Sequence, residues 1–280
     1  SLPSGPGSIL VLGDSFQPQL NSGSGAYSVA IQLPSGPAGF TPSLSLQYHT
    51  GNGNGCLGVG WKMSGLTMVS RNMDGGLPLY VDAANGLDDD FDGTVDNPEE
   101  MDRFSGVDLE ELVPLPDATF RSESEESFIR YELTATGWKA RTKGGLLHEF
   151  GTTSFARIEN GNKEFAWLLE RTTDLNGNTI EYRYRTDPGS LGQKYCSEMR
   201  WAGSTAFYAA VMTYEANRPD VHSDFRSGFE VRTGLRLARI DIIAQGVPAS
   251  PGAITGDLND DGKPDSLIRR YVLEYEAKAV

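Results

Sequence analysis

The sequence predicts an all-β protein, an antiparallel meander of short strands and hairpins that forms a curved sheet or a sandwich. Three observations lead to this fold class. Apolar residues alternate with polar ones over many short stretches, which is the period of a half-buried strand. Turns rich in glycine and asparagine separate these stretches, and the 280 residues include 33 glycines. Stretches with the period of a helix are scarce, so no helix is expected.

The chain divides into three segments by composition. Residues 1–72 hold an N-terminal hairpin region, residues 73–112 form an acidic insert, and residues 113–280 form an antiparallel β region. We expect the three segments to make one continuous structural unit. The chain begins at Ser1 rather than Met, and residues 270–276 read as an interrupted strand, so we expect a fragment of a larger protein.

The first segment predicts a β-hairpin with a glycine-rich tip. Alternation predicts a strand over residues 26–33, and residues 34–37 turn the chain into the next strand. Glycine and asparagine alternate at 51–55, and both tolerate the positive φ of a tight reversal. The hairpin strands are expected from the alternating residues on each side of this tip: Leu44, Leu46 and Tyr48 before it, and Leu57, Val59 and Trp61 after it.

Short strands with turns between them follow one another from residue 119. Turn signals lie at 136–137, 143–145, 160–162 and 176–178, each of which contains glycine. Strands joined by such short turns pair antiparallel, so we expect a meander. The predicted strands are 119–121, 128–134, 138–141, 146–150, 155–159, 165–172, 179–185, 198–201, 207–214, 229–232, 235–244 and 267–275.

Net charge limits the partners of this chain. It is -14 at pH 7, which argues against nucleic acid or an anionic membrane as a partner. Between residues 82 and 111, twelve acidic residues stand against Arg103 alone, and twelve minus one leaves eleven of the fourteen net charges there. Repulsion of that density would keep the segment unfolded unless cations offset it. The chain has no apolar run of about 18 residues, so we expect no membrane span.

The acidic insert contains a candidate calcium loop. Residues 88–99 match the D-x-D-x-D-G-x5-E spacing, which places about six to eight oxygen ligands on a short path. Gly93 allows the sharp turn, and Val95 is expected to pack inward. Pro98 departs from a helical EF-hand, so we expect a stand-alone loop that resembles dockerin or thrombospondin repeats. The alternative is a solvated acidic loop. The proposed ligands are Asp88, Asp90, Asp92, the Thr94 carbonyl, Asp96 directly or through water, and bidentate Glu99.

A second candidate calcium loop lies at residues 257–265. It follows a glycine and precedes a predicted strand, and it resembles the D-x-N-x-D-G-x-x-D loops of FG-GAP and related β-propeller repeats. Its twelfth position is Ile268, so the bidentate glutamate is missing and Asp265 must substitute for it. The alternative is a plain Asn/Asp/Gly turn. The proposed ligands are Asp257, Asn259, Asp261, the Lys263 carbonyl and Asp265, and the two loops together predict about two Ca2+ ions.

Two stretches of the chain resemble known families. Tyr48, the tip TGNGNG at 50–55, the run GVGW at 58–61 and the pair SR at 70–71 form a specific string. It resembles the opening of the SpvB-type N-terminal domain, which also begins the B component of Tc insecticidal toxins. Residues 174–184 resemble the Rhs or YD-repeat hairpin, in which tyrosines line one face. The resemblance therefore places Tyr182 and Tyr184 on one face, and Glu181 and Arg183 on the other.

The resemblance implies a structural role in a large secreted toxin. In Tc toxins this region helps to build a hollow β-sheet cocoon around a toxic C-terminal payload. The ADP-ribosyltransferase activity of full-length SpvB resides, by the same resemblance, in a separate C-terminal region, so we expect this chain not to be an enzyme. Its expected partners are the remainder of the parent toxin or Rhs shell and other toxin-complex subunits. Calcium would fold the acidic insert where the ion is abundant, which couples folding to export.

Two other functions remain open from the sequence. A calcium-dependent adhesion or glycan-binding module needs an exposed aromatic residue near the ion, and Phe91 and Tyr80 stand beside the first loop. An SGNH-type esterase would use Ser15, which follows an apolar stretch and a Gly-Asp pair, with His222 and Asp220 as partners. The spacing of Asp220 and His222 is two rather than three, which disfavours the esterase.

The two cysteines leave one further alternative open. Cys56 and Cys196 would form a disulfide in an oxidising compartment, but a count of two carries little weight. Two buried thiols are favoured.

Overall fold

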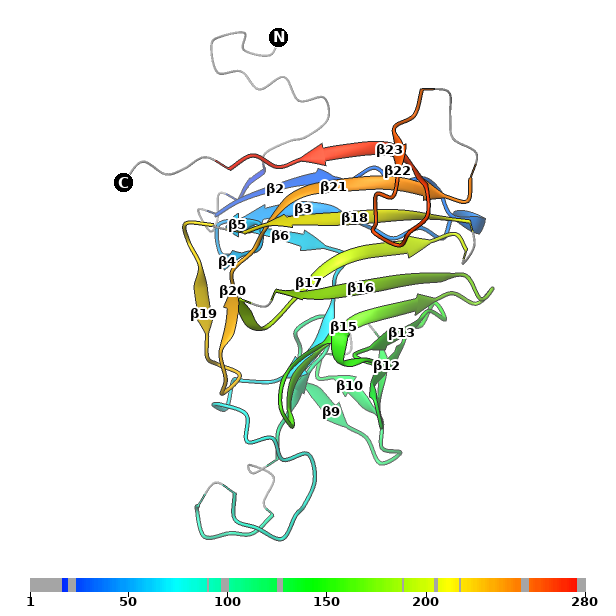
Figure 1. Cartoon of the computed structure of the whole chain (residues 1–280). Coiled ribbons are helices and arrows are strands. Elements are labelled where there is room, and N and C mark those ends of the chain that lie inside the picture. The colour runs from blue at the N-terminus through cyan, green and yellow to red at the C-terminus, as the bar shows by residue number, and fades with distance from the viewer. Residues whose placement is uncertain are drawn as a thin grey trace. The chain divides into compact units, whose positions relative to one another are not determined.

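A computed structural model describes residues 17–19, 24–89, 91–96, 101–124, 128–187, 189–203, 206–216, 218–247 and 252–275. Almost all regular structure among them is β-strand, which confirms the predicted fold class (Figure 1). The helical elements in these ranges are two short 3-10 turns, η1 (Pro37–Gly39) and η2 (Ser154–Ala156). No helix within the described ranges is long and apolar enough to cross a membrane.

The chain packs as two compact units. One unit comprises the described parts of Ser1–Gln32 and Ser43–Gly65, and the other comprises those of Leu33–Pro42 and Leu66–Val280. The three-segment division drawn from the sequence stays a prediction beside this packing.

The first unit contains a four-stranded antiparallel sheet in the order β1-β2-β3-β6. Strands β3 and β6 form the predicted hairpin, with Tyr48 opposite Trp61 and their ring centroids 5.5 Å apart. Leu44 and Leu46 are buried beneath it, as the alternation predicts. The strands are β1 (Gln17–Gln19), β2 (Ser24–Ala30), β3 (Ser45–His49) and β6 (Trp61–Ser64), with a short pair at the tip, β4 (Asn54–Gly55) and β5 (Gly58–Val59).

The strand expected through Leu57, Val59 and Trp61 is interrupted. Gly60 has a φ of 82°, in the left-handed region, and separates β5 from β6. A side chain at this glycine would place its Cβ 2.4 Å from Cε2 of Tyr48. Because the backbone reverses there, Leu57 is buried while Val59 is 69% exposed, so the three residues do not share one face.

One antiparallel sheet of 15 strands dominates the second unit. Twelve of its strands lie in the order β22-β23-β21-β18-β17-β16-β15-β13-β12-β11-β10-β9, which confirms the predicted meander (Figure 1). Their bounds are β9 (Leu112–Pro114), β10 (Phe120–Ser122), β11 (Arg130–Thr134), β12 (Gly137–Arg141), β13 (Leu147–Phe150), β15 (Lys163–Thr173), β16 (Thr179–Asp187), β17 (Ser190–Trp201), β18 (Phe207–Glu215), β21 (Arg236–Gln245), β22 (Thr255–Gly256) and β23 (Asp265–Val272).

Three further strands join this sheet at β15, and two pair separately. β7 (Met68–Arg71) and β14 (Arg157–Asn160) both pair with the first half of β15, and β8 (Phe104–Ser105) pairs with β7. The separate pair is β19 (His222–Asp224) with β20 (Val231–Thr233). The strand predicted at 155–159 is thus η2 followed by β14.

An aromatic cluster forms part of the core of the second unit. Trp138 of β12 is fully buried, and its ring centroid lies 4.9 Å from that of Phe104 and 5.1 Å from that of Phe120. Trp167 of β15 lies 5.8 Å from Phe104. The cluster therefore packs β8, β10, β12 and β15 together.

The hairpin of β15 and β16 has the turn that the sequence predicts. The Asp174 carboxylate accepts hydrogen bonds from the backbone nitrogens of Asn176 and Asn178, both at 2.8 Å. Tyr182 is buried, and the Tyr184 hydroxyl donates to the Leu169 carbonyl at 2.7 Å. Both tyrosines are thus held within the sheet by burial or by a hydrogen bond, which agrees with the predicted common face. Whether this hairpin is a YD repeat stays a prediction.

The two cysteines are thiols in this structure and not a disulfide. Cys196 of β17 is buried, whereas Cys56 at the hairpin tip is only half-buried.

Candidate metal loops and the charged face of the sheet

The first candidate loop lies between β7 and β8, and its described residues form no helix or strand. The Asp88 carboxylate accepts a hydrogen bond through Oδ2 from the Gly93 nitrogen at 3.0 Å, and Asp92 accepts one from the Thr94 nitrogen at 2.6 Å. Asp88 Oδ1 is buried and has no hydrogen-bond partner within the described ranges. The predicted ligands Asp90 and Glu99 lie outside the described residues.

Two residues of the first loop lie where the sequence did not place them. Val95 is 54% exposed, so the expected inward packing is wrong. Asp96 turns back along the chain, and its carboxylate accepts hydrogen bonds from the backbone nitrogens of Asn85 at 2.7 Å and Gly86 at 3.0 Å. Phe91 is 89% exposed.

The second candidate loop joins β22 to β23 and lies across the sheet (Figure 1). Its Leu258 packs against an apolar cluster of Phe207, Ala209 and Ile243 on the strands below. The Asp257 carboxylate accepts hydrogen bonds from the backbone nitrogens of Asp261 at 3.0 Å and Gly262 at 2.9 Å. These contacts hold the loop closed over β18 and β21.

The acidic and amide groups of the second loop are tied to the sheet. Asp265 is 1% exposed, and its carboxylate accepts a hydrogen bond from the Leu258 nitrogen at 2.9 Å. The Asn259 amide donates through Nδ2 to Glu198 Oε1 at 3.1 Å, while its Oδ1 is buried without a hydrogen-bond partner among the residues described. Lys263 donates its backbone N–H to Asp261 at 3.1 Å.

The charge state of Asp261 follows from its contacts. Burial acts to raise the pKa of this carboxyl group. Hydrogen bonds from Gln245, Lys263 and Asn259, together with the Arg200 charge, outweigh that effect and lower the pKa below its usual value. Arg200 Nη2 lies 3.5 Å from Asp261 Oδ2. The group is therefore a carboxylate at neutral pH, as a calcium ligand must be.

The two loops share several backbone features among their described residues, although 169 positions separate their starts at Asp88 and Asp257. The fourth residue has a left-handed φ in both, 64° at Phe91 and 59° at Asp260, and so does the sixth, which is glycine. In both, the first carboxylate accepts from the sixth backbone nitrogen and the fifth carboxylate from the seventh. In both, one predicted ligand oxygen is buried and unpartnered within the described chain.

No three His, Cys, Asp or Glu side chains in the described part of the chain gather closely enough to hold a metal as they stand. The loops bring their predicted ligands onto short turns, but they do not draw the carboxylates together. Calcium binding therefore stays a prediction.

Arg71 anchors the acidic insert to the sheet. This residue of β7 is 3% exposed, and its Nη1 lies 2.5 Å from Asp82 and 2.6 Å from Asp102. Its Nε donates to the Glu164 carbonyl at 2.7 Å, and its guanidinium lies 4.8 Å from the centroid of the Tyr80 ring. The Arg71 guanidinium thus neutralises part of the negative charge of the insert, which from the sequence alone was expected to need bound cations.

Tyr80 is held in the same cluster. Its hydroxyl donates to the Ser227 carbonyl at 2.5 Å. Burial raises the pKa of Tyr80 to about 12, with Arg71 lowering it and Asp102 raising it. Tyr80 is therefore not the exposed aromatic residue that a sugar platform needs.

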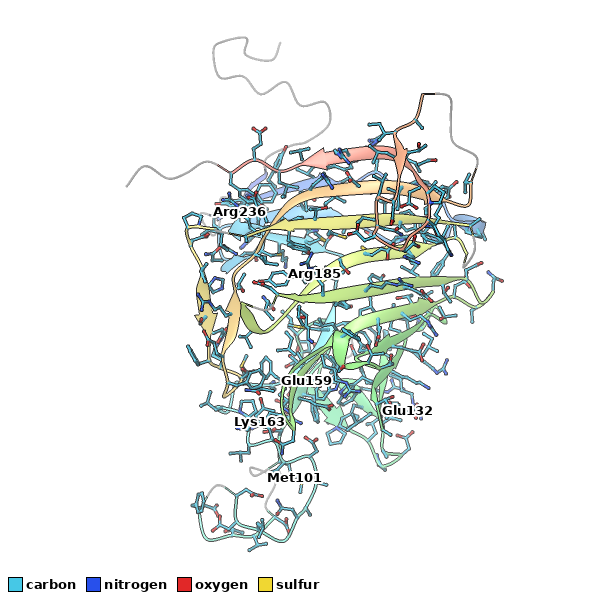
Figure 2. All side chains as sticks on the ribbon, viewed as in Figure 1. Met101, Glu132, Glu159, Lys163, Arg185 and Arg236 are labelled. Atoms are coloured by element: carbon cyan, nitrogen blue, oxygen red, sulfur yellow. The ribbon has the colours of Figure 1, made fainter. Side chains whose placement is uncertain are left out.

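One face of the large sheet carries a row of alternating charges. Each member lies directly opposite the next in the strand register, and paired residues of neighbouring strands project from the same face. Glu132 of β11, labelled in Figure 2, begins the row. A groove of about 570 Å³ lies over its middle. The row consists of Glu132, Lys139, Glu149, Arg171, Glu181 and Arg200.

The row ends at the second candidate loop. Arg171 lies 3.5 Å from Glu181, and Arg200 contacts both Glu198 at 2.7 Å and Asp261 at 3.5 Å. The buried Glu198 in turn holds Asn259. The charged face and the loop are therefore parts of one connected polar network.

The sequence did not single out several residues of these sites. Glu198 lies 59 residues before the second loop and Gln245 twelve residues before it; both belong to strands outside the loop, and no local spacing marks them. Arg71 belongs to the family-like pair at 70–71, and a lone arginine that ends a strand before a run of acidic residues is a further signal of an ion pair.

The residues of the esterase alternative are not assembled. Ser15 lies outside the described residues. The Asp220 carboxylate is bound by Arg218 at 2.9 Å. His222 Nδ1 is buried and has no hydrogen-bond partner among the described residues, so Asp220 does not orient this ring through Nδ1.

Known proteins are similar to this chain over most of its length. The family model described as "Salmonella virulence plasmid 65kDa B protein" matches residues 19–214. Relatives named mono(ADP-ribosyl)transferase SpvB, from Salmonella typhimurium and Salmonella dublin, are 24% identical over 91% of this chain. The chain spans about half the length of these relatives, 52%.

Solved structures show the same fold. The TcdB2-TccC3 structure matches 99% of this chain and 16% of its own chain, with a TM-score of 0.71 and 21% identity. A Photorhabdus luminescens Tc holotoxin pore matches 99% and 15%, with a TM-score of 0.71 and 23% identity. The N-terminal domain of the effector protein SpvB from Salmonella typhimurium matches 89% and 99%, with a TM-score of 0.63 and 20% identity.

These names overturn one expectation. The sequence predicted a protein that is not an enzyme, but the curated relatives carry the name of a mono(ADP-ribosyl)transferase. The name of these relatives contradicts the expectation that this chain is not an enzyme, and the chain spans 52% of the length of the relatives that carry it.

Proposed function

The chain belongs to the SpvB family, as its hairpin string predicted, and on that premise we propose that it forms a wall segment of a β-sheet shell in a larger secreted toxin. The shell encloses or carries a toxic payload, and calcium in the two loops stabilises the wall. The partners of this segment are the remainder of the parent toxin and other toxin-complex subunits, in an extracellular setting.

The observation that carries the wall proposal is the open meander of the second unit. Its twelve-strand path does not close on itself within the described residues, and β9 and β22 are its ends. β22 covers only two residues of β23, whose Ile268 and Val272 are 48% and 65% exposed. An uncovered strand edge with exposed apolar side chains is a site where another strand or segment adds. Such a sheet suits a wall that continues into neighbouring parts of a larger protein.

The two faces of the sheet also suit a wall. One face buries the aromatic and aliphatic core of the unit, including Trp138, Met199 and Ile242. The other carries the row of alternating charges, which remains compatible with water while its members neutralise one another. A wall with one such polar face can meet solvent or a polar surface without aggregating.

The calcium part of the proposal is supported by the shared geometry of the two loops. Asp88 Oδ1 and Asn259 Oδ1 are buried oxygens without hydrogen-bond partners in the described chain, and such groups cost free energy unless a donor or a cation satisfies them. Calcium takes carboxylate, amide and carbonyl oxygens. In the ion-free chain the carboxylates repel one another, and the ion draws them together. Folding then becomes complete where calcium is abundant.

A chimera tests the wall. This chain replaces the matching 16% of the TcdB2-TccC3 chain, and a second chimera carries the SpvB N-terminal domain as the matched control. We expect the first chimera to purify as a single assembled species that resists protease as the parent does. Aggregation or rapid proteolysis of the first chimera, while the control assembles, would contradict the wall.

Metal analysis tests the calcium. The purified chain should hold about two calcium ions, one per loop, and should melt at a lower temperature in chelator. Asp257→Asn should remove one ion, whereas Asp260→Asn, at the fourth position of the same loop, should leave the count unchanged. A chain that holds no calcium, or that melts at the same temperature with and without chelator, would remove this part of the proposal.

A calcium-dependent glycan-binding or adhesion module is the second candidate function, and one observation favours it. Phe91 is 89% exposed at the fourth position of the first loop, where a sugar could stack on it beside the ion. Glycan-array binding that is lost both in chelator and in Phe91→Ala would support this function. Phe155→Ala is the control, because Phe155 is 65% exposed on η2, away from both loops in sequence.

A further inference from the structure

Gln245 points its amide into the second loop. It is the last residue of β21 and lies opposite Asp265 of β23 in the strand register. Its side chain is among the buried polar groups, with 4% exposure. Nε2 lies 3.0 Å from both carboxylate oxygens of Asp261 and 2.9 Å from Oδ1 of Asp265. One neutral amide therefore joins the fifth and ninth residues of the loop.

The Asn259 amide is oriented in a complementary way. Its Nδ2 donates to Glu198, which is 5% exposed and is itself held by Arg200 at 2.7 Å. The nitrogen and the oxygen of an amide diverge, so Oδ1 turns away from Glu198. That oxygen is buried and has no hydrogen-bond partner among the described residues. A buried, unsatisfied oxygen at the third position of the loop calls for a cation or a donor.

We propose that Gln245 is a positioning residue of the calcium site in the second loop. It ties the Asp261 and Asp265 carboxylates to one amide, from which the ion can draw them together, and it compensates for the glutamate that the loop lacks at Ile268. This inference rests on the calcium role proposed above. No local motif contains Gln245, because it precedes the loop by twelve residues and belongs to another strand.

A neutral amide suits this task for an electrostatic reason. Asp261 in the loop and Asp265 at the start of β23 both contact this amide, and two carboxylates so close together repel each other, the more so because Asp265 is only 1% exposed. Two N–H donors reduce that repulsion without adding a charge that would compete with the ion. A lysine in the same place would satisfy both carboxylates permanently. The Gln245 amide therefore orients the two carboxylates of the loop without neutralising them, so their negative charge remains to attract the cation.

The first test removes the two donors. Calcium affinity is measured by titration calorimetry on the whole chain, in a background whose first loop carries Asp88→Ala. Gln245→Leu should bind calcium about 10- to 100-fold more weakly, which is the usual loss when a partner behind a metal ligand is removed. Gln193→Leu is the matched control, since Gln193 Nε2 donates to Thr233 at 2.9 Å on another part of the sheet. The control should bind as the background does.

The second test inserts a charge and also serves if the leucine variant does not fold. Gln245→Lys should melt at a higher temperature than the background in chelator, because its ammonium satisfies both carboxylates. It should also lose the calcium-dependent rise in melting temperature. A residue that acts only through packing would shift melting equally with and without calcium and leave calcium affinity unchanged, and that result would overturn the inference.

The outcomes separate this inference from the function on which it rests. If the Asp88→Ala background binds no calcium, the calcium role of the second loop fails and the inference fails with it. If the background binds one ion and Gln245→Leu binds it equally tightly, only the role of Gln245 is refuted. Weaker binding in Gln245→Leu with an unchanged Gln193→Leu supports both.

Discussion

Replacing Arg71 by methionine should destabilise the protein strongly. The substitution keeps most of the apolar stem but removes a guanidinium that is buried between two carboxylates and above three aromatic rings, those of Tyr80, Phe104 and Trp167. The Asp102 side chain is only 8% exposed, so the substitution leaves a nearly buried charge without its counterion. The expected result is local loss of the insert from the sheet, followed by global destabilisation.

The magnitude follows from the burial of the partners. Removing one partner of a buried ion pair costs about 3–5 kcal/mol. The Asp82 side chain is 46% exposed and adds little, because water screens it. We therefore expect Arg71→Met to lower the free energy of unfolding by about 3–5 kcal/mol, which corresponds to roughly 6–20 °C in melting temperature for a chain of this size. Urea unfolding followed by tryptophan fluorescence measures it.

A second arginine on the same segment is the control. Arg103 is 56% exposed and lies 3.2 Å from Glu111, so Arg103→Met should cost about 0–1 kcal/mol. Adding Asp102→Asn to Arg71→Met should recover part of the loss, because it removes the uncompensated charge and keeps an acceptor for one of the two backbone nitrogens, those of Leu79 and Tyr80, that donate to Asp102. If Arg71→Met and Arg103→Met differ by less than about 1 kcal/mol, the anchoring argument is refuted.

Three further predictions follow from the fold and the loops. Gly60→Ala should lower the melting temperature through about 1–3 kcal/mol of backbone strain and its clash with Tyr48, whereas Gly53→Ala, which meets no atom within 4 Å, should not. Burial lowers the pKa of His148, so its contribution to stability is complete above the unfolded pKa of about 6.5 and is lost as pH falls below it. Between pH 7 and pH 5, the free energy of unfolding measured in denaturant should therefore decline less in His148→Gln than in the unchanged protein. An equal decline in the two proteins would contradict this prediction. Chelator should increase proteolysis within both loops. Equal cleavage rates with and without calcium would contradict the proposal that calcium binds them.

The alternation in the sequence was enough to predict most strands because it reports a local property. Residues 207–214 and 235–244 alternate or run apolar, and they became β18 and β21 with nearly these bounds. The strand predicted at 198–201 is instead β17, Ser190–Trp201, because its first half lacks alternation and is held by its pairing with β16. Likewise β8 and β9 are too short to show a period, and their pairing with β7 and β10 fixes their place.

The candidate loops likewise show local features that the sequence predicted and a packing feature that it did not predict. Spacing placed the carboxylates, the glycines and the turns, since those depend on residues within about twelve positions of one another. It also predicted that Val95 packs inward, which is wrong, because this side chain is 54% exposed and the direction of a loop side chain depends on tertiary packing rather than on spacing.

By itself the sequence determined the all-β class, the order of hairpins, the SpvB family and the positions of both loops, all of which are encoded in neighbouring residues through the pleat of a strand and the φ of a turn. Only the tertiary structure decided which distant groups meet. Arg71 meets Asp102, Glu198 meets Asn259, and Gln245 meets Asp261 and Asp265. Such meetings depend on strand register and on burial, and these arise only when the strands pair into a sheet.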